Sequence, residues 1–544
     1  MIIKNLFAAG RSVVFPLMLL AQSASAEQRS RRMLGEGKSW ETPVFTIDPE
    51  VRGPTVIITG GVHGNEPAGA AAAEQIRHWP IRRGKLIVIP RVNTAGLEEG
   101  TRYIPKAIEE QKDLNRNFPS PGIAEGPRGE IASTLWELVA DQNPDWLFDL
   151  HEGYQFNISH KPKSGKQKSV GSSIIFDSQQ DVDSVVAGML AAANSRVTRA
   201  DRRFVLLGRG PKKTTLAAAA VDVIGARAMT LETTYQYQRL PVRTRQHRAM
   251  INVALNHLGM IETDCTDVMA PVESERRDRT FVALYDDEGG SDRGVTNLAR
   301  ALSMNSDIEV VRLSADDIRS NVLSQFDVVV FGGGSGSKEA AAIGDEGAVA
   351  VRAFVQDGGG CVGVCAGAFL CSAHYQWSLN LVDTHVFTGK REVEGVGAKS
   401  MWYRGKSSSQ KMQLTKEGRS LFPDTPEHVE VRYQNGPIVS PKSFPGLNPY
   451  TVLAWFRSEK VLYAPQKGTM IDTPAIISGD YGKGRVISIS PHPEATEGLE
   501  SMIPQSIKAV SKVRRKHVAE VSVSPRSDGP KVERSVETTL SVAP

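Results

Sequence analysis

Short apolar runs alternate with stretches of helical composition through most of the chain. The first half holds four runs of strand length, at residues 56–58, 86–89, 146–150 and 228–231. A stretch of helical composition, residues 68–76, lies between the first two runs. Strands that alternate with helices predict an α/β sheet, and the ligands of such a sheet bind beyond the carboxyl ends of its strands.

The same pattern starts afresh in the second half. Apolar runs of strand length recur at residues 280–285, 308–313, 328–331, 358–365 and 486–489, and residues 295–302 show an amphipathic helical pattern. The charged segment 263–279 lacks periodicity and is interpreted as a linker. A chain of 544 residues exceeds one ordinary core. We therefore predict two α/β domains, residues 40–262 and 280–509.

The N-terminus has the composition of a secretory signal. Lys4 and Arg11 precede an apolar core at residues 12–21, and the small residues 24–26 offer a cleavage site. The apolar core is short and contains a proline, which makes it a poor membrane span. An uncleaved anchor or a buried helix is the alternative. We expect residues 1–26 to be a signal peptide and the mature protein to be exported, periplasmic or extracellular, without a stable membrane span.

Polar composition marks two further segments and narrows the class of protein. Residues 27–42 are polar and Arg-rich and are interpreted as a solvated lead-in, while the patternless residues 510–544 predict a disordered tail.

The net charge is only +4, which argues against the clustered basic surface of a nucleic-acid-binding protein. The four cysteines include no Cys-x-x-Cys pair, so neither a disulfide scaffold nor a cysteine zinc site is expected.

Histidine and carboxylate side chains follow three of the predicted strands. His63 and Glu66 are three residues apart, so one turn can direct both at a single cation. His151 and Glu232 each follow a later strand. A catalytic zinc site needs three protein ligands, an open position for water and a nearby base. The sequence therefore predicts a Zn²⁺ site of His63, Glu66 and His151, with Glu232 as the spare carboxylate and Asp149 available to orient a ligand.

The motifs around these residues resemble the zinc carboxypeptidase family, including its aspartoacylase and succinylglutamate desuccinylase branch. The resemblance covers about residues 45–260 in the family's order, and it rests on His63-Gly-Asn-Glu66, Asn93-Thr-Ala-Gly-Leu with Arg102, Asp113-Leu-Asn-Arg-Asn-Phe-Pro119, Asp149-Leu-His151 and Thr230-Leu-Glu232. It implies that the three predicted ligands bind zinc and that Glu232 is the general base. It also implies that Arg102 stabilises the oxyanion, and that Asn115 with Arg116 holds the terminal carboxylate of the substrate.

Two features of the chain depart from the family pattern. The charged segment 104–112 separates Arg102 from the Asp-Leu-Asn-Arg string. The tyrosine that covers the substrate in carboxypeptidases has no evident match, so Tyr235, Tyr237 or no tyrosine serves in its place.

A cysteine in the second domain lies in a Gly-x-Cys-x-Gly turn. Cys365 follows a predicted strand, and glycines on both sides permit the sharp turn of a nucleophile elbow. His492 and Glu494 follow another strand, which completes the side chains of a catalytic triad. This domain resembles the class I glutamine amidotransferase-like family, in particular the domain at the N-terminus of some biotin protein ligases. The resemblance implies a triad of Cys365, His492 and Glu494 and an oxyanion loop at residues 332–334. Apart from the resemblance, we expect residues 432–437 to line the cleft.

Together the two resemblances predict fold and function. We expect a zinc carboxypeptidase-like α/β/α mixed sheet followed by a flavodoxin-like α/β/α sandwich. The expected activity is that of an exported zinc hydrolase cleaving an amide bond next to a free carboxylate, with a metallocarboxypeptidase on peptides, cell-wall peptides included, as the leading hypothesis. Its partner is then a peptide or an N-acyl amino acid. The alternatives are an N-deacylase of the aspartoacylase type and a binding protein whose second domain is non-catalytic.

Overall fold

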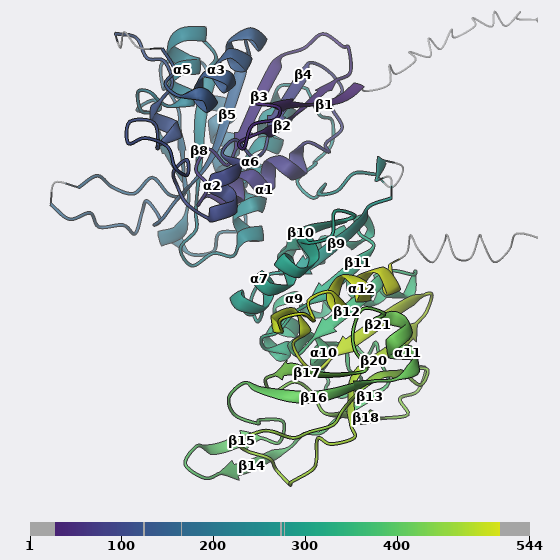
Figure 1. Cartoon of the computed structure of the whole chain (residues 1–544). Helices are drawn as coiled ribbons and strands as arrows, with labels where there is room; N and C mark the ends of the chain where they lie inside the picture. The colour runs from purple at the N-terminus through teal and green to yellow at the C-terminus, as the bar shows by residue number, and fades with distance from the viewer. Residues whose placement is uncertain (1–27, 123–125, 165, 273–274, 277, 512–544) are drawn as a thin grey trace, which may run out of the picture.

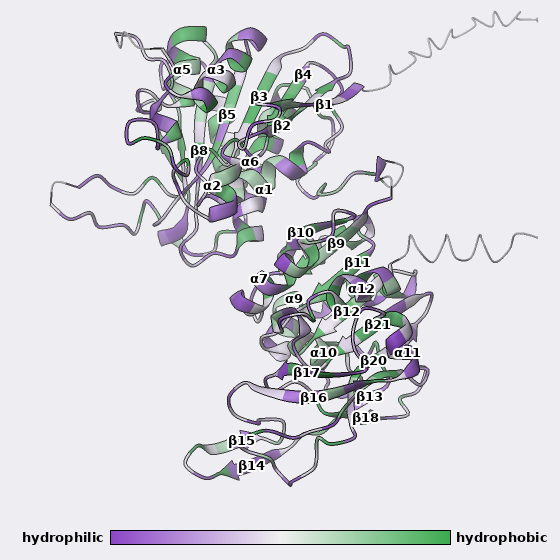
Figure 2. Cartoon of the chain, in the orientation of Figure 1, coloured by the Kyte–Doolittle hydropathy of each residue, from purple (hydrophilic) through white to green (hydrophobic). Residues whose placement is uncertain are grey.

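The computed structural model describes residues 28–122, 126–164, 166–272, 275–276 and 278–511. The predicted signal peptide and all but the first two residues of the predicted tail lie outside this range. The chain forms one eight-stranded and one nine-stranded sheet, each flanked by helices (Figure 1). The central strands of both sheets are coloured as hydrophobic in Figure 2. The expected mixed α/β architecture is confirmed.

The first sheet has a parallel centre and a mixed periphery. Its strand order is β1-β2-β4-β3-β5-β8-β6-β7. β4, β3, β5 and β8 pair in parallel, whereas β1, β2 and β6 join the sheet through antiparallel pairs. The strands are β1 (Gln28–Leu34), β2 (Thr42–Asp48), β3 (Thr55–Gly60), β4 (Lys85–Ile89), β5 (Trp146–Gly153), β6 (Ser173–Ile175), β7 (Val205–Leu207) and β8 (Arg227–Thr234).

Helices cover both faces of this sheet. α1 (Pro67–Ile76), α4 (Asp183–Asn194) and α6 (Leu240–His257) pack on the face that carries Val56 and Ile58. α3 (Glu130–Gln142) and α5 (Leu216–Ala219) pack on the opposite face, against Ile57. Successive strand residues alternate between the faces, so β3 must be apolar throughout to fill both cores. The short α2 (Thr94–Glu99) follows β4.

The interpretation of residues 27–42 as a solvated lead-in is wrong for residues 28–34. Gln28–Leu34 form β1, which pairs with β2 at the edge of the sheet. Most of its side chains face solvent, and only Leu34 is buried. An edge strand whose side chains mostly face solvent has a polar composition like that of a loop, so the sequence of residues 28–34 did not indicate a strand.

The second sheet has a parallel half and an antiparallel half. Its strand order is β10-β9-β11-β12-β21-β20-β19-β16-β17, and the first five strands are parallel. In chain order these five read 2-1-3-4-5, which is the flavodoxin-like arrangement predicted for this domain. The strands are β9 (Thr280–Tyr285), β10 (Ile308–Leu313), β11 (Val328–Phe331), β12 (Gly360–Val364), β16 (Ser408–Leu414), β17 (His428–Tyr433), β19 (Thr451–Phe456), β20 (Pro474–Tyr481) and β21 (Gly484–Ile489).

Its helices again form two layers. α7 (Asp292–Ser303) and α12 (Met502–Val510) share one core, while α8 (Ala315–Arg319), α9 (Gly336–Gln356) and α10 (Ala366–Cys371) share the other. α11 (Lys416–Leu421) packs on β19. Two small antiparallel pairs complete the domain, β13 (Thr384–Val386) with β18 (Val439–Pro441) and β14 (Lys390–Val393) with β15 (Gly397–Ser400).

The segment predicted as a linker packs between the two halves of the chain. Cys265 belongs to the core of the first half, and Met269 belongs to a core of the second. Beside it, Arg245 and Arg248 on α6 donate to Asp317 on α8 at 3.0 and 3.1 Å. The domain boundaries themselves stay a prediction.

Among the described residues, no helix combines the length and the apolar character needed to cross a bilayer.

Candidate functional site

Three adjacent parallel strands bring the predicted metal ligands together. β3, β5 and β8 lie side by side, and their register places His151 opposite Glu232. His63 and Glu66 lie in the turn between β3 and α1. That turn must be glycine-rich, because a Cβ at Gly64 would lie 1.9 Å from the carbonyl carbon of Gly96. The sequence pattern therefore positions all four side chains at the carboxyl end of one sheet, as expected.

The donor atoms of His63, Glu66 and His151 converge on one point. Glu66 Oε1 lies 2.8 Å from His63 Nδ1, and Glu66 Oε2 lies 2.7 Å from His151 Nδ1. The two Nδ1 atoms are 3.1 Å apart. Zinc–ligand bonds of about 2.0–2.1 Å at tetrahedral angles separate the donors by about 3.3 Å, close to these spacings. All three residues are buried, and the donor set fits Zn²⁺.

A carboxylate behind each histidine fixes the ring nitrogen that faces the other two ligands. His151 Nε2 lies 2.8 Å from Asp149 Oδ2, and His63 Nε2 lies 3.2 Å from Asp113 Oδ1. A proton held on Nε2 leaves the lone pair of Nδ1 free for a metal. Asp149 is itself held by the Thr59 hydroxyl, which donates to Oδ1 at 2.7 Å. Both rings are therefore oriented with Nδ1 toward the other ligands, as zinc ligation through Nδ1 requires.

The charges at this cluster shift the pKa values of its members. Burial would raise the pKa of Glu66, but the charges of His63 and His151 hold it well below its usual value. Burial would lower the pKa of His151, but the charges of Asp149 and Glu66 raise it well above 6.5. The positive charge on the two histidines comes from the protons that their rings carry. A metal cation bound among the same donor atoms would replace those protons, because it supplies the same positive charge there.

Glu232 lies beside the ligands without joining them. It is 8% exposed, and burial raises the pKa of its carboxyl to about 8. In the described part of the chain, no side-chain hydrogen bond occupies its carboxylate. Glu232 is thus a carboxyl group next to the ligand cluster that can accept or give a proton near neutral pH.

The predicted substrate-binding residues occupy three different settings. Arg102 is tied down, since it donates to Glu66 at 3.0 Å and to Asp113 at 3.4 Å. Asn115 is buried, donates to Asp149 at 3.4 Å and accepts from the Leu216 N–H. Arg116 has no carboxylate within ion-pair distance among the described residues. The substrate contacts of all three stay predictions, and Arg116 is the one with a free charge.

Several residues of the site had no assigned role in the sequence. Asp113 opens the Asp-Leu-Asn-Arg string and binds His63, which is a signal that the motif already carried. Glu152, directly after His151, forms a buried ion pair with Arg243 of α6 and accepts from the Ala68 N–H at 3.2 Å. Tyr154 also had no assigned role; it packs on Tyr235, one of the two candidates for the substrate-covering tyrosine, with ring centroids 5.0 Å apart, and both are exposed just past β5 and β8. No short motif announces these last contacts.

In the second domain, the predicted nucleophile elbow is present at Cys365. The residue has φ 53° and ψ −97° between β12 and α10, a strained conformation for a side chain other than glycine. The flanking glycines are required, because a Cβ at Gly363 would lie 2.5 Å from the Gly367 carbonyl oxygen. One at Gly367 would lie 2.2 Å from the Phe331 carbonyl oxygen. This turn lifts the Cys365 side chain out of the sheet, as nucleophile elbows do.

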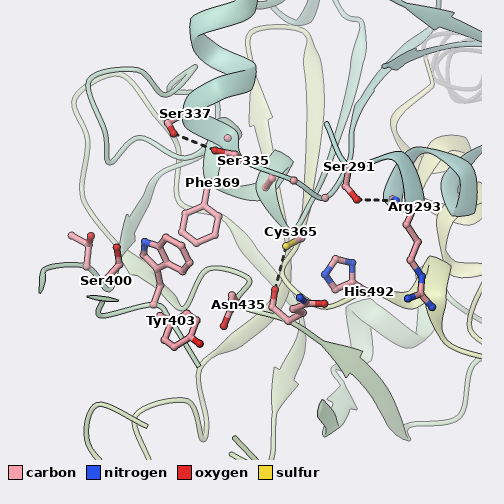
Figure 3. A pocket seen from close by; sticks show the side chains of 18 of the residues that line it. Ser291, Arg293, Ser335, Ser337, Cys365, Phe369, Ser400, Tyr403, Asn435 and His492 are labelled. Atoms are coloured by element: carbon pink, nitrogen blue, oxygen red, sulfur yellow. Dashed lines mark hydrogen bonds between the residues drawn. The ribbon is translucent and has the colours of Figure 1, made fainter. Parts of the chain in front are cut away.

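His492 and Glu494 complete the arrangement at the end of β21. His492 Nδ1 lies 2.8 Å from Glu494 Oε1, and Glu494 is 1% exposed. Burial would lower the pKa of His492, but its contacts with Cys365 and Glu494 raise it to about 10. A Cβ on Gly333 of the predicted oxyanion loop would lie 3.2 Å from the His492 ring, so this loop passes close to both reactive side chains (Figure 3). The triad residues are brought together as predicted, and their catalytic roles stay predictions.

Comparison with known proteins agrees with both halves of this picture. A model of the succinylglutamate desuccinylase/aspartoacylase catalytic domain matches residues 52–161, and a model of the N-terminal domain of biotin-protein ligase matches residues 280–524. An N-alpha-acetyl-L-2,4-diaminobutyric acid deacetylase from Halomonas elongata is 31% identical over 112 residues, which cover 20% of this chain and 31% of the relative. The chain thus spans about a third of that relative.

Solved structures with a similar fold are more distant. Product-bound Csd4, a cell shape determinant from Helicobacter pylori, has 18% identity and a TM-score of 0.34, covering 43% of this chain and 56% of its own. A succinylglutamate desuccinylase/aspartoacylase from Rhodobacter sphaeroides has 23% identity and a TM-score of 0.31, covering 45% and 69%. At these TM-scores the likeness carries no functional argument.

Both family resemblances predicted from the sequence are confirmed. In the N-terminal half, residues 52–161 match the catalytic domain of the succinylglutamate desuccinylase/aspartoacylase type, a branch of the zinc carboxypeptidase-like proteins. The C-terminal half carries a domain of the biotin-protein ligase N-terminal type. The matches to the first domain support an enzyme and, more narrowly, a hydrolase.

Proposed function

We propose that the N-terminal half is a zinc-dependent hydrolase that cleaves an amide bond next to a free carboxylate, and that the protein is exported. The convergence of His63, Glu66 and His151, with Glu232 beside them, carries this proposal. Zinc bound there would lower the pKa of a water ligand toward about 7 and polarise the substrate carbonyl.

The residues around the ligands suit the remaining tasks of amide hydrolysis. Glu232 accepts the proton of the attacking water and returns it to the leaving nitrogen. The Arg116 guanidinium donates to the Asn115 carbonyl oxygen and has no carboxylate partner among the described residues. Such a group can bind a carboxylate bidentately. A carboxylate held by Arg116 fixes which amide bond of the substrate reaches the zinc ligands. Arg102 would have to release Glu66 or Asp113 to contact a carbonyl oxygen, so its predicted role requires a rearrangement on binding.

Two substrate classes share this leaving group, which is an amino acid with a free carboxylate. We favour peptides, including cell-wall peptides, because the exposed Tyr154–Tyr235 pair extends the site beyond the strand ends and offers a surface to a long acyl chain. The second candidate is an N-acyl amino acid, which is favoured by the matched family model and by the deacetylase from Halomonas elongata.

Metal analysis combined with a substrate screen tests the activity. The expected result is one zinc per chain and cleavage of peptides with a free C-terminus but not of their C-terminal amides. Glu232→Gln should abolish cleavage while zinc content is unchanged, and Glu137→Gln, an exposed carboxylate on α3, should leave both as they are. Faster cleavage of N-acetyl or N-succinyl amino acids than of peptides would select the second candidate. Equal rates on free and amidated peptides would overturn the carboxylate requirement.

The export proposal rests on the sequence of residues 1–26 alone. Cell fractionation with N-terminal sequencing tests it. We expect the mature chain outside the cytoplasm with a new N-terminus after Ala26, and a full-length cytoplasmic chain would refute export.

A further inference from the structure

A large cavity opens above the Cys365 elbow. Its volume is about 830 Å³, and Cys365, His492 and Glu494 all line it. Cavities of about 300–1,000 Å³ accommodate drug-sized ligands. Figure 3 shows Phe369 and Tyr403 on one side of Cys365 and His492 and Arg293 on the other. The space over the nucleophile therefore exceeds what a single free amino acid such as glutamine would fill.

One wall of the cavity is aromatic. Tyr375 and Trp377 stack with centroids 4.6 Å apart and planes 7° apart, and Trp402 lies edge-on to Phe369 at 5.8 Å. These rings line the cavity together with Tyr403. Packed rings of this kind offer flat faces to a ligand, and contact with a second flat ring is favourable beyond the burial of apolar area alone. The wall therefore suits a flat, bulky group and gives a small polar amide little to bind.

The charge of the lining is one-sided. Arg293, Lys390 and Arg432 line the cavity, and Glu494 is the sole acidic residue among the lining positions. Glu494 is buried and bonded to His492, so its charge is committed to the triad. None of the three cations forms an ion pair with a carboxylate in the described part of the chain. Unpaired cations around an aromatic cavity favour a ligand that carries a negative group.

We propose that this domain is a second hydrolase in which Cys365 cleaves bulky, anionic amides and not free glutamine. The flat part of the substrate lies on the aromatic wall and its negative group faces Arg293 and Arg432. This assignment is independent of zinc and of the activity proposed for the first domain.

The reaction uses only the triad and water. The Cys365 sulfur bonds to the carbonyl carbon while its proton passes to His492. The carbon–nitrogen bond then breaks, and the nitrogen leaves as an amine with that proton. A water oxygen next attacks the thioester carbon, the carbon–sulfur bond breaks, and the proton of the water returns through His492 to sulfur. The products are a carboxylic acid and an amine, and Glu494 orients His492 throughout.

Three amides separate this proposal from its alternatives. Glutaryl-7-amido-4-methylcoumarin has a flat ring and a carboxylate, butyryl-7-amido-4-methylcoumarin has the ring alone, and L-glutamine has neither a ring nor bulk. The full chain carrying Glu232→Gln, which silences the first domain, is assayed with each. We expect kcat/KM for the glutaryl compound to exceed that for the butyryl compound by about tenfold, the value of one charge-assisted contact, and glutamine to be inert.

Variants assign the effect to named residues. Cys365→Ala should abolish hydrolysis, and mass spectrometry should find a glutaryl thioester on Cys365 in the parent chain. Arg293→Ala should lower kcat/KM for the glutaryl compound and so reduce its preference over the butyryl compound, whereas Arg300→Ala on the same helix should leave the rates of both compounds unchanged. Circular dichroism verifies folding. A preference for glutamine, equal rates on the two coumarin amides, or no turnover and no adduct on Cys365 would each overturn the proposal.

Discussion

Replacing Asp149 by asparagine tests how the protein holds its metal ligands. Asp149 is fully buried and its two oxygens accept from Thr59 at 2.7 Å and pair with His151 at 2.8 Å. Asparagine has the same shape, so its oxygen can still accept from His151, while its amide faces the Thr59 hydroxyl, which turns to accept. The fold is therefore retained, but the negative charge that fixes the His151 tautomer is lost. Loss of such an outer carboxylate costs about 10–100-fold in metal affinity.

The structure also predicts that Asp149 contributes more to zinc affinity than Asp113, the carboxylate that contacts the other histidine. Asp113 is 22% exposed on its side chain and lies 3.2 Å from His63, so solvent screens it and its contact is longer. We expect Asp149→Asn to weaken zinc binding by about 100-fold, or about 2.7 kcal/mol, and Asp113→Asn by about tenfold. Competition with a chromophoric chelator measures both constants, and Asp222→Asn, an exposed carboxylate, is the control. An equal or larger loss in Asp113→Asn would refute this account of the site.

Three further predictions concern stability and redox state. Glu339 is buried, neither of its carboxyl oxygens has a hydrogen-bond partner among the described residues, and burial raises its pKa to about 8. The unfolded chain loses this proton near pH 4.5, so the free energy of unfolding should fall between pH 5 and 8. Denaturant titrations should show a smaller fall in Glu339→Gln. Asp317→Ala removes the carboxylate that pairs with the buried Arg248 and should lower the free energy of unfolding by about 3–5 kcal/mol. A loss below about 1 kcal/mol would show that this ion pair does not stabilise the fold. The Cys361 and Cys371 sulfurs are 3.6 Å apart, so peptide mapping after oxidation with glutathione disulfide should find them joined and Cys265 free.

The sequence predicted the centres of both sheets because buried parallel strands must be apolar on two faces. The run at 56–58 became β3 and the run at 146–150 became β5, which continues to Gly153. The antiparallel strands of the second sheet, such as β16 and β17, were not anticipated. Their alternating or largely exposed residues resemble surface loops when read singly, and their partners are distant along the chain.

The site residues divide in the same way: those within local sequence motifs could be predicted, and those that depend on distant partners could not. His63, Glu66 and His151 follow strands within short motifs, so strand order alone brings them together. The ion pair between Glu152 and Arg243 depends on how α6 packs across the sheet, which no local pattern specifies. Short motifs indicate candidate metal ligands well because metal chemistry restricts the residue types that can serve. An ion pair that supports the site only needs two side chains of opposite charge, so it leaves no motif.

Both candidate sites follow one physical rule, and this rule makes them separable. Each lies where adjacent parallel strands end, β3, β5 and β8 in the first sheet and β12 with β21 in the second. The two halves are joined at α6, where Arg245 and Arg248 pair with Asp317 and Arg239 donates to the Gly290 carbonyl oxygen at 2.6 Å. None of these residues belongs to the predicted zinc-ligand cluster or to the Cys365 triad. Strain at Cys365 is stored within its own strand–helix turn, and the predicted zinc ligands are held by Asp149 and Asp113 of the first half. A substitution in one site should therefore leave the other intact, so the two activities can be measured on one chain and assigned one at a time.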